Sequence, residues 1–379
     1  MRPLGRFVGL YAAMYAAYGV ASPFLPAFLT ERGVAPEQLG VVLATGTTIR
    51  LLAAPLAARI ADLAQALRVV MAICIALAAA VTLAYLPARG FWLFLGLTLL
   101  HAAFLAPMTV LADALTLGAS RRPPGFEYGW VRGTGSAAFI VGTLISGQTV
   151  GAFGLDAIVW SQAALLALAA AAGMLVPELP HERTAPAARA PAGGVVALLR
   201  IPLFRNLVLV AALILGSHAM HDAFAVIRWT GAGISASTAS LLWSAAVVAE
   251  VIVFFAIGPA LIRWLSPAGA IALAAIAAII RWAVMALTTD LVALALVQPL
   301  HGITFALLHL ACMRLLARIM PPGLEGTAQA IYATVGIGAA SALLTFLSGF
   351  LYSALGAQGF WVMAALCAAA LPLTLKLRA

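Results

Sequence analysis

The chain has 379 residues, of which 64% are hydrophobic and only 9% are charged, whereas a soluble domain carries about 25% charged residues. This composition excludes a water-soluble globular protein. The formal net charge is +9, but charged residues are too sparse for a nucleic-acid-binding face. The only lysine, Lys376, lies close to the C-terminus, so the chain lacks the Gly-Lys-Ser/Thr element of a phosphate-binding loop. An ATP-driven pump of that kind is therefore excluded.

Twelve apolar stretches follow one another along the chain, each long enough to cross a bilayer core, which takes about 20 helical residues. Turn residues and charges separate them, as at Glu31-Arg32-Gly33 and Ser266-Pro267. The stretches are 6–30, 37–61, 67–87, 91–118, 128–151, 154–176, 203–230, 236–262, 267–288, 291–317, 326–352 and 357–376. The sequence thus predicts an all-α membrane protein with twelve transmembrane helices.

The distribution of basic residues predicts the orientation of these helices. With both termini in the cytoplasm, the inside segments hold fifteen basic residues and the outside segments hold two, Arg32 and Arg89. Arginine and lysine collect in cytoplasmic loops. A missed or extra helix would scramble this asymmetry, so it supports both the count and cytoplasmic termini.

The longest polar segment, 177–202, is rich in proline, alanine and glycine and is predicted to be a flexible cytoplasmic linker. It separates an N-terminal six-helix half, residues 1–176, from a C-terminal six-helix half, residues 203–379. Two such halves form the layout of major-facilitator transporters, whose substrate site lies near the membrane midplane between the repeats. A major-facilitator fold is therefore expected.

Charged residues inside the predicted spans mark where function is to be sought. Each costs about 2.5–3.5 kcal/mol at a helix centre on insertion scales. Left unpaired, all of them together would cost on the order of 20 kcal/mol, more than the net stability of a typical fold. These residues are Arg50, Asp113, Arg132, Asp222, Arg228, Glu250 and Arg281. They must pair, reach the membrane surface or face water.

Asp113 and Arg132 lie on the two sides of one helical hairpin, nineteen residues apart. The hairpin returns the chain, so both side chains can face each other at similar depth. A charged pair that touches a polar substrate is one interpretation, and a structural ion pair is the other.

Span seven carries His218, His221 and Asp222 at spacings of three and four residues, which place His218 on one helical face with the other two. Three interpretations fit these residues: a proton or solute site, a zinc site, and a hydrogen-bonded interhelical cluster. The chain has no His-Glu-x-x-His motif, and its cysteines Cys74, Cys312 and Cys367 lie far apart in apolar stretches. We therefore expect no metal and no bound cofactor.

Glu250 stands in the middle of span eight among apolar residues. A carboxyl group in such surroundings can take up and release a proton near neutral pH, so Glu250 is a candidate proton carrier; a permanently protonated structural residue is the alternative. Arg281 on span nine and His301 and His309 on span ten complete the set. His301 follows Pro299-Leu300, where proline loosens the helix backbone.

Several segments resemble a known family. Residues 126–135, FEYGWVRGTG, resemble the F-E-x-G-x-x-R-x-x-G signature of bacterial lactose permease and its relatives. Other segments are similar to the phenylpropionate permease branch of the same superfamily. They are Tyr18-Gly19, Pro23-Phe24-Leu25-Pro26, Gly216-Ser217-His218-Ala219, Leu242-Trp243 with Glu250, Arg281-Trp282 with Met285, and Leu300-His301-Gly302 with Thr304-Phe305 and His309. Together they run along nearly the whole chain.

The resemblance implies a proton-coupled solute symporter. Asp113 and Arg132 match the charged pair that contacts substrate in the permease. Glu250, Arg281 and His301 match three members of its coupling network, for which the proton is the coupling ion.

Two positions depart from the permease pattern. Thr304 stands where the permease has a carboxylate three residues beyond its histidine, which leaves the proton path open. Phe139 stands where the permease has a tryptophan that stacks on sugar, which argues against a galactoside. Phenylpropionate-like acids are the family's indication, and an organic anion would suit Arg132 or Arg281; because related permeases carry nucleosides, a nucleoside-like solute stays open.

The sequence as a whole predicts a secondary active transporter of a bacterial inner membrane that works by alternating access and functions as a monomer. Its expected partners are a small-molecule substrate and the lipid bilayer, with no nucleic acid. The substrate-binding candidates are Asp113, Arg132, Phe139, Arg281, His218 and Asp222, and the proton-coupling candidates are Glu250, His301 and His309. A proton-driven efflux antiporter is the nearest alternative. A membrane enzyme or a transport-dead sensor is a more distant one, because the chain shows no nucleophile–base signature.

Overall fold

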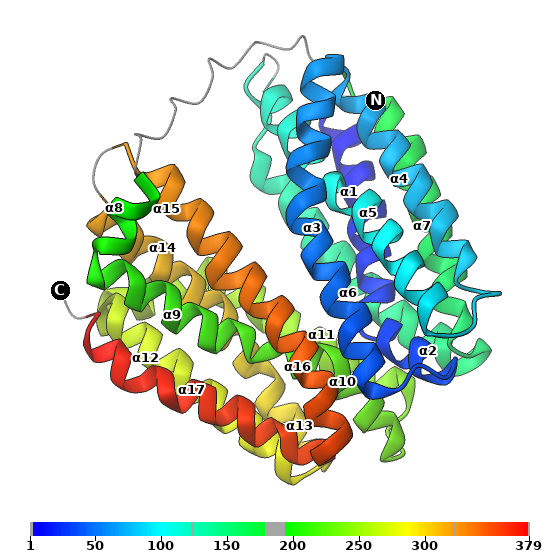
Figure 1. Cartoon of the computed structure of the whole chain (residues 1–379). Helices are drawn as coiled ribbons and strands as arrows, with labels where there is room; N and C mark the ends of the chain where they lie inside the picture. The colour runs from blue at the N-terminus through cyan, green and yellow to red at the C-terminus, as the bar shows by residue number, and fades with distance from the viewer. Residues whose placement is uncertain (1–2, 123–124, 179–193, 321–322, 378–379) are drawn as a thin grey trace. The chain divides into compact units, whose positions relative to one another are not determined.

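A computed structural model describes residues 3–122, 125–178, 194–320 and 323–377. Within these ranges the chain is helical throughout and contains no strand, with short turns between successive helices (Figure 1). The all-α membrane architecture expected from the composition is confirmed.

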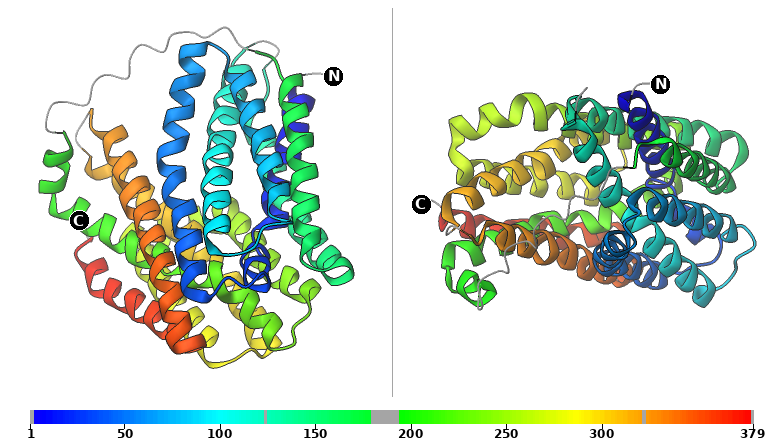
Figure 2. Two further views of the ribbon diagram at one scale, coloured as in Figure 1. Left: turned by 45° about the vertical axis from the view of Figure 1, so that its right-hand side comes forward. Right: turned by 90° about the horizontal axis from the view of Figure 1, so that it is seen from above.

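Contacts within the chain divide it into two compact units. Unit 1 comprises residues 1–182 together with Trp229–Leu241. Its principal helices run side by side, as the blue-to-green ribbons of Figure 2 show. They are α1 (Pro3–Ala21), α2 (Leu25–Glu31), α3 (Pro36–Ala64), α4 (Leu67–Ala84), α5 (Phe91–Ser120), α6 (Tyr128–Phe153) and α7 (Asp156–Leu175).

Unit 2 comprises residues 183–228 and 242–379. Short 3₁₀ or π segments interrupt several of its helices. Its elements are α8 (Gly194–Arg200), α9 (Pro202–Gly216), α10 (His218–Gly231) up to Arg228, α11 (Ala236–Ile252) from Leu242, η1 (Val253–Ile257), α12 (Gly258–Leu287), α13 (Leu291–Val297), η2 (Gln298–Leu300), η3 (Gly302–Leu307), α14 (Leu308–Ile319), α15 (Glu325–Ile331), η4 (Tyr332–Ala339), α16 (Ala340–Leu355), η5 (Gly356–Gly359) and α17 (Phe360–Leu375).

Twelve crossings can be counted in the described part of the chain. Nine continuous helices are long and apolar enough to span a membrane, and α1 with α2 forms a tenth span bent by 43°. Two of the nine, Ala236–Leu287 and Glu325–Leu375, are 52 and 51 residues long, enough to cross twice. The first breaks at Ser266, whose φ of 64° is left-handed, and the second at η5.

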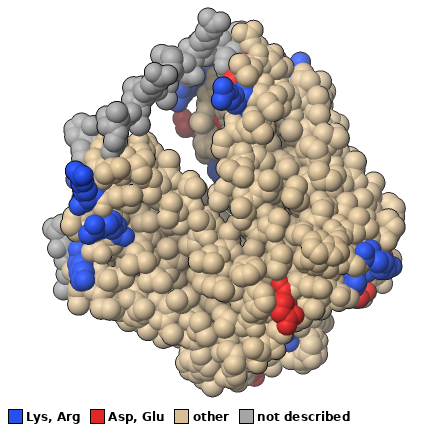
Figure 3. All heavy atoms as spheres, viewed as in Figure 1, with Lys and Arg blue, Asp and Glu red and all other residues tan. Residues whose placement is uncertain are grey.

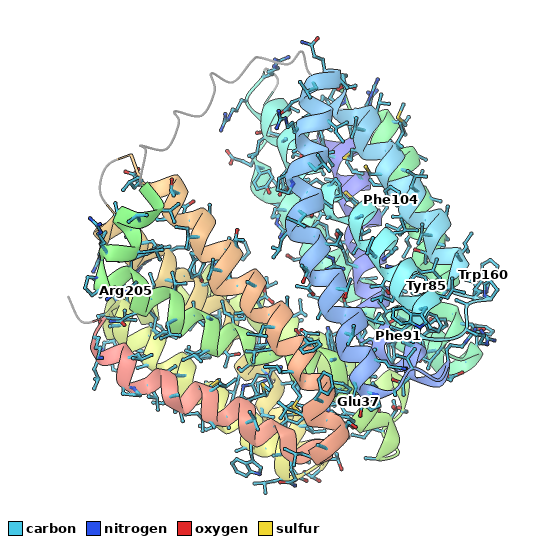
Figure 4. All side chains as sticks on the ribbon, in the orientation of Figure 1. Glu37, Tyr85, Phe91, Phe104, Trp160 and Arg205 are labelled. Atoms are coloured by element: carbon cyan, nitrogen blue, oxygen red, sulfur yellow. The ribbon has the colours of Figure 1, made fainter. Side chains whose placement is uncertain are left out.

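The surfaces of the helices are apolar, as a lipid environment requires. Trp92 is 80% exposed and Trp160, which points away from its helix in Figure 4, is 60% exposed. Figure 3 shows few charged side chains on the face in view, with long uncharged stretches between them. Such a surface would be an aggregation hazard in water, so these helices belong in a bilayer.

Small residues set the packing of α1 against α6. Gly19 lies under the backbone carbonyl of Phe139, and Gly142 lies against the backbone of Ala16. A Cβ atom at either glycine would collide with backbone. Close approach through small residues is how membrane helices gain packing energy without a hydrophobic driving force.

The chain repeats its backbone turns at a spacing of 200 residues. Gly33 and Gly233 both have φ of 88°, and each donates its N–H over 3.0 Å to the carbonyl three residues earlier. Helix α5 begins at Phe91 and α13 at Leu291. Residues 200 apart in these regions therefore occupy equivalent positions in two copies of one helical unit, the internal repeat expected of such transporters.

Part of the predicted linker can be compared with the structure. Residues 179–193 lie outside the described residues, as do Pro123-Pro124 and Pro321-Pro322 at two other predicted breaks. Residues 194–200 form the helix α8 instead of continuing a flexible linker, because the run Val195-Val-Ala-Leu-Leu199 is apolar and Leu198 is fully buried. The half boundaries at 176 and 203 stay a prediction.

Candidate functional site

The guanidinium of Arg281 is the centre of a polar cluster inside unit 2. Arg281 lies on α12 and is 0% exposed. Its Nη1 is 3.1 Å from Nδ1 of His301, and its Nη2 is 3.3 Å from Nε2 of His221. Nη2 also donates to Oε1 of Gln298 over 2.9 Å. A buried arginine thus contacts three polar side chains, which offsets part of its desolvation cost.

Each of the two histidines has a carboxylate on its far side. Nδ1 of His221 lies 3.1 Å from Oδ1 of Asp222, and Nε2 of His301 lies 3.4 Å from Oε2 of Glu250. The side chains form one continuous series from Asp222 through His221, Arg281 and His301 to Glu250. We call these five residues the relay.

The contacts with Arg281 determine which ring nitrogen of His221 and of His301 carries the hydrogen. A guanidinium has donors only, so Nε2 of His221 and Nδ1 of His301 must accept from Arg281. The hydrogen of each neutral ring is therefore on the opposite nitrogen, where it points at Asp222 or Glu250. Doubly protonating either ring removes an acceptor of Arg281 and places two cations side by side.

Solvent reaches the two ends of the relay, but its middle is buried. The Asp222 side chain is 60% exposed and that of Glu250 is 31% exposed, whereas Arg281 is fully buried. Protons can therefore enter or leave the series at the carboxylates but not at the guanidinium.

His218 and His309 lie beside the relay. His218 is 5% exposed and places Nε2 2.9 Å from the Thr304 hydroxyl, which in turn donates to the His301 carbonyl over 3.3 Å. The Thr304 hydroxyl therefore joins two histidines at the position where the lactose permease pattern has a carboxylate. Nδ1 of His309 lies 3.3 Å from the Tyr332 hydroxyl, and among the described residues no hydrogen bond joins His309 to Arg281 or His301.

Asp113 of unit 1 is held by tyrosine hydroxyls. Oδ1 accepts a short hydrogen bond from Tyr11 on α1 and another, 2.9 Å long, from Tyr128 on α6. Thr116 donates to the Tyr11 hydroxyl over 3.3 Å. Hydrogen bonds to a carboxylate are roughly twice as strong as neutral ones, so Asp113 is firmly positioned.

Arg132 lies on the aromatic face of Tyr15, with Cζ 4.7 Å from the ring centroid, a cation–π geometry. Its Nη1 is buried and has no hydrogen-bond partner in the described part of the chain. No ion pair within 4 Å joins Arg132 to Asp113 among these residues; the two groups contact different tyrosines. Phe139 follows two turns along α6, with its backbone against Gly19.

Three residues of these clusters were not predicted from the sequence: Tyr11, Tyr15 and Gln298. Tyr11, Tyr15 and Tyr18 recur at i, i+4 and i+7, a single helical face, and neighbouring rings lie 5.8 and 6.0 Å apart. This period was visible in the sequence. Gln298, by contrast, gave no signal beyond a polar residue in an apolar run.

Twelve membrane crossings in two units, with charged and imidazole groups clustered inside each, define a secondary transporter of the major-facilitator class. Residues 4–363 match the model of the MFS_1 like family. The chain belongs to this family, and its relatives are transporters rather than enzymes.

The similarity to curated relatives runs over almost the full chain. A protein of Escherichia coli K12, described as a probable 3-phenylpropionic acid transporter, is 34% identical across 93% of this chain and 92% of its own length. The maltose permease of Geobacillus stearothermophilus is 24% identical across 90% of this chain and 86% of its own. Both relatives are described as transporters of small molecules.

Solved structures show the same fold. The nucleoside transporter NupG superimposes with a TM-score of 0.86 over 100% of this chain and 98% of its own, at 16% identity. A bacterial homologue of the human lysosomal transporter Spinster gives 0.71 over 99% and 96%, at 14% identity. The expectation of a major-facilitator fold is confirmed.

Proposed function

We propose that this chain is a proton-coupled symporter that carries a small aromatic carboxylate across the bacterial inner membrane by alternating access. The relay is the observation on which the proposal rests. It has one exposed and one partly exposed carboxylate at its two ends, and a buried arginine whose hydrogen bonds depend on neutral imidazoles. A transporter that needed no proton would have little use for such a costly buried network.

The substrate class follows from unit 1 and from the relatives. Among the described residues, no acceptor reaches the buried Nη1 of Arg132, and the guanidinium lies on a tyrosine ring. A carboxylate supplies the missing acceptor, and an aromatic body suits Tyr15 and Phe139. The E. coli relative is described as a probable transporter of 3-phenylpropionic acid, which has both features.

Roles follow for the remaining candidates. Asp113 holds Tyr11 and Tyr128 in place at the substrate site. Asp222 is the exposed end of the relay, where solute can reach it, and the buried His218 lies beside the relay. Arg281 is fully buried and its two terminal nitrogens contact His301, His221 and Gln298, so it sets the imidazoles of the relay and does not bind substrate directly. His309 lies beside the Tyr332 hydroxyl and assists proton coupling.

The transport cycle uses these parts in order. Glu250 takes up a proton. Its carboxyl group then no longer holds the N–H of His301 as a charged carboxylate does, and the contacts of the relay weaken. Substrate then neutralises the cationic group of unit 1, and the halves rock with both ligands bound. Release of substrate and proton on the other side restores the relay around Arg281.

Purified protein in proteoliposomes with an internal pH dye tests this function. External 3-phenylpropionate is expected to acidify the lumen, with 3-phenylpropanol as the uncharged control. Alkalinisation would instead establish proton antiport. Acidification by nucleosides alone would keep the coupling and refute the substrate class. Silence with every compound, together with saturable uptake of a labelled acid, would refute proton coupling.

Cytoplasmic termini and a monomeric working state complete the proposal. The asymmetry of basic residues supports the orientation. A reporter fused to the C-terminus that is active only in the cytoplasm tests it, and light scattering of the active detergent-solubilised protein tests the monomer.

A further inference from the structure

The 200-residue repeat pairs three residues of the polar cluster in unit 2 with a second set in unit 1. Glu250 corresponds to Arg50, His301 to His101, and His218 to Tyr18. His301 is thus matched by another histidine, His101, whereas the carboxylate of Glu250 is matched by the guanidinium of Arg50. None of these three unit 1 residues has a role in the function proposed above.

Packing brings the three residues together. Gly46 of α3 lies against Thr98 and Ala102 of α5, and Arg50 follows Gly46 by one helical turn on the same face. Arg50 consequently lies beside His101 of α5 and interacts electrostatically with it, with Tyr18 and with Tyr85. The ring of His101 also packs edge-on against Tyr85, which Figure 4 labels at the end of α4.

This set is polar but incomplete. His101 is 6% exposed, and its Nε2 has no hydrogen-bond partner in the described part of the chain. Among the described residues, no carboxylate forms an ion pair with Arg50. A guanidinium in the middle of a span is unfavourable by about 2.5–3.5 kcal/mol when unpaired, and an unsatisfied buried nitrogen costs about 1–3 kcal/mol. The set therefore contains a guanidinium and an imidazole but no carboxylate paired with them in the described part of the chain.

In unit 2 the corresponding histidine does have its acid, because Oε2 of Glu250 lies 3.4 Å from His301. We propose that Arg50, His101 and Tyr18 form a carboxylate-binding site in unit 1, where the anionic group of the transported solute takes the place that the Glu250 carboxylate has in unit 2. This site rests on the proposed aromatic carboxylate substrate and deepens it.

The site is separate from the Asp113 cluster. His101 and Asp113 are twelve residues apart on α5, or about 18 Å along a helix, farther than a small monocarboxylate reaches. A row of rings joins the two clusters, from Tyr11 of the Asp113 cluster through Tyr15 to Tyr18 of the proposed site. An aromatic solute can pass along these ring faces from Arg132 to Arg50, with a cationic group at each station.

Binding of an acid and its uncharged analogue separates the carboxylate contact from all others. Purified protein in detergent is titrated with radiolabelled 3-phenylpropionate and with 3-phenylpropanamide. Wild-type protein should prefer the acid, and Arg50→Gln should weaken acid binding at least about tenfold, the range of a charged hydrogen bond, while amide binding stays the same. Arg59→Gln makes the same change on an exposed residue of the same helix and should bind as wild type does.

Two further variants guard against misfolding. Arg50→Lys keeps the charge and should recover part of the acid preference, and His101→Phe should weaken the acid but not the amide. Gel filtration and thermal melting confirm that each variant is folded. Acid binding by a folded Arg50→Gln equal to that of Arg59→Gln overturns the Arg50 site alone. Absence of acid binding by wild-type protein overturns the proposed substrate class, and the Arg50 site with it.

Discussion

The guanidinium of Arg281 donates to Nδ1 of His301 across 3.1 Å, and the other nitrogen of that ring lies 3.4 Å from the Glu250 carboxylate. The ring is therefore held between a permanent cation and an acid. While Arg281 is in place, the ring's hydrogen points at Glu250. A second proton on the ring would have to bind Nδ1 and displace Arg281, so protonation of His301 and the position of the arginine are linked.

Replacing Glu250 by glutamine should abolish accumulation of substrate against a gradient, because the amide cannot exchange a proton. Counterflow, in which labelled solute exchanges for unlabelled solute, should persist because it needs binding and rocking but no net deprotonation. Both are measured in proteoliposomes with an imposed pH gradient. Full accumulation by Glu250→Gln would remove Glu250 from the coupling mechanism.

Arg281→Lys should uncouple substrate from protons even though the charge is kept. A lysine ammonium is a compact point charge and cannot reproduce the planar fork that contacts His221, His301 and Gln298 together. We expect proton-driven accumulation to fall at least about tenfold, the effect of losing one buried charged hydrogen bond. The matched control is Arg263→Lys, an exposed arginine on the same helix α12. Equal accumulation by the two variants would contradict the role of the fork.

Gly19→Ala should destabilise unit 1 by about 1–3 kcal/mol, the usual cost of overpacking, because its new Cβ would meet the Phe139 carbonyl. Gly9→Ala, also on α1, has nothing within 4 Å of the added Cβ. It should be neutral or stabilising by up to about 1 kcal/mol through helix propensity. Thermal melting of the detergent-solubilised protein compares them; a lower midpoint for Gly9→Ala than for Gly19→Ala would refute the packing of α1 on α6.

Arg32 should matter more for stability than its partner Asp156. Arg32 donates to the Leu86 carbonyl, pairs with Asp156 and lies 4.8 Å over the Phe28 ring. The Asp156 side chain is 49% exposed, and a pair of this kind is worth about 0–1 kcal/mol. A double-mutant cycle of Arg32→Gln and Asp156→Asn, followed by thermal melting, should give a small coupling and a larger loss for Arg32→Gln. An equal or larger loss for Asp156→Asn would mean that the ion pair dominates.

The membrane architecture could be predicted from the sequence because it depends on composition. A bilayer demands about 20 apolar residues per span, and arginine distribution sets orientation, so length, hydropathy and charge suffice. The break at Ser266-Pro267 could also be predicted from the sequence, since proline ends a helix. The structure has a left-handed residue, Ser266, at this break. The prediction of a flexible linker was wrong for residues 194–200, because the five apolar residues of this short helix bury one face only after packing.

The sequence by itself determined which residues carry charge inside the membrane, and hence that Asp113, Arg132, Glu250 and Arg281 needed partners. Only the tertiary structure decided who those partners are, because spans far apart in the chain meet at angles that no local period encodes. It gave Asp113 two tyrosines instead of Arg132, and it brought His221, Gln298 and His301 around one arginine. It also placed Arg50 beside His101, with no carboxylate ion-paired to Arg50 among the described residues, since packing of α3 on α5 depends on the small volume of Gly46 and not on charge.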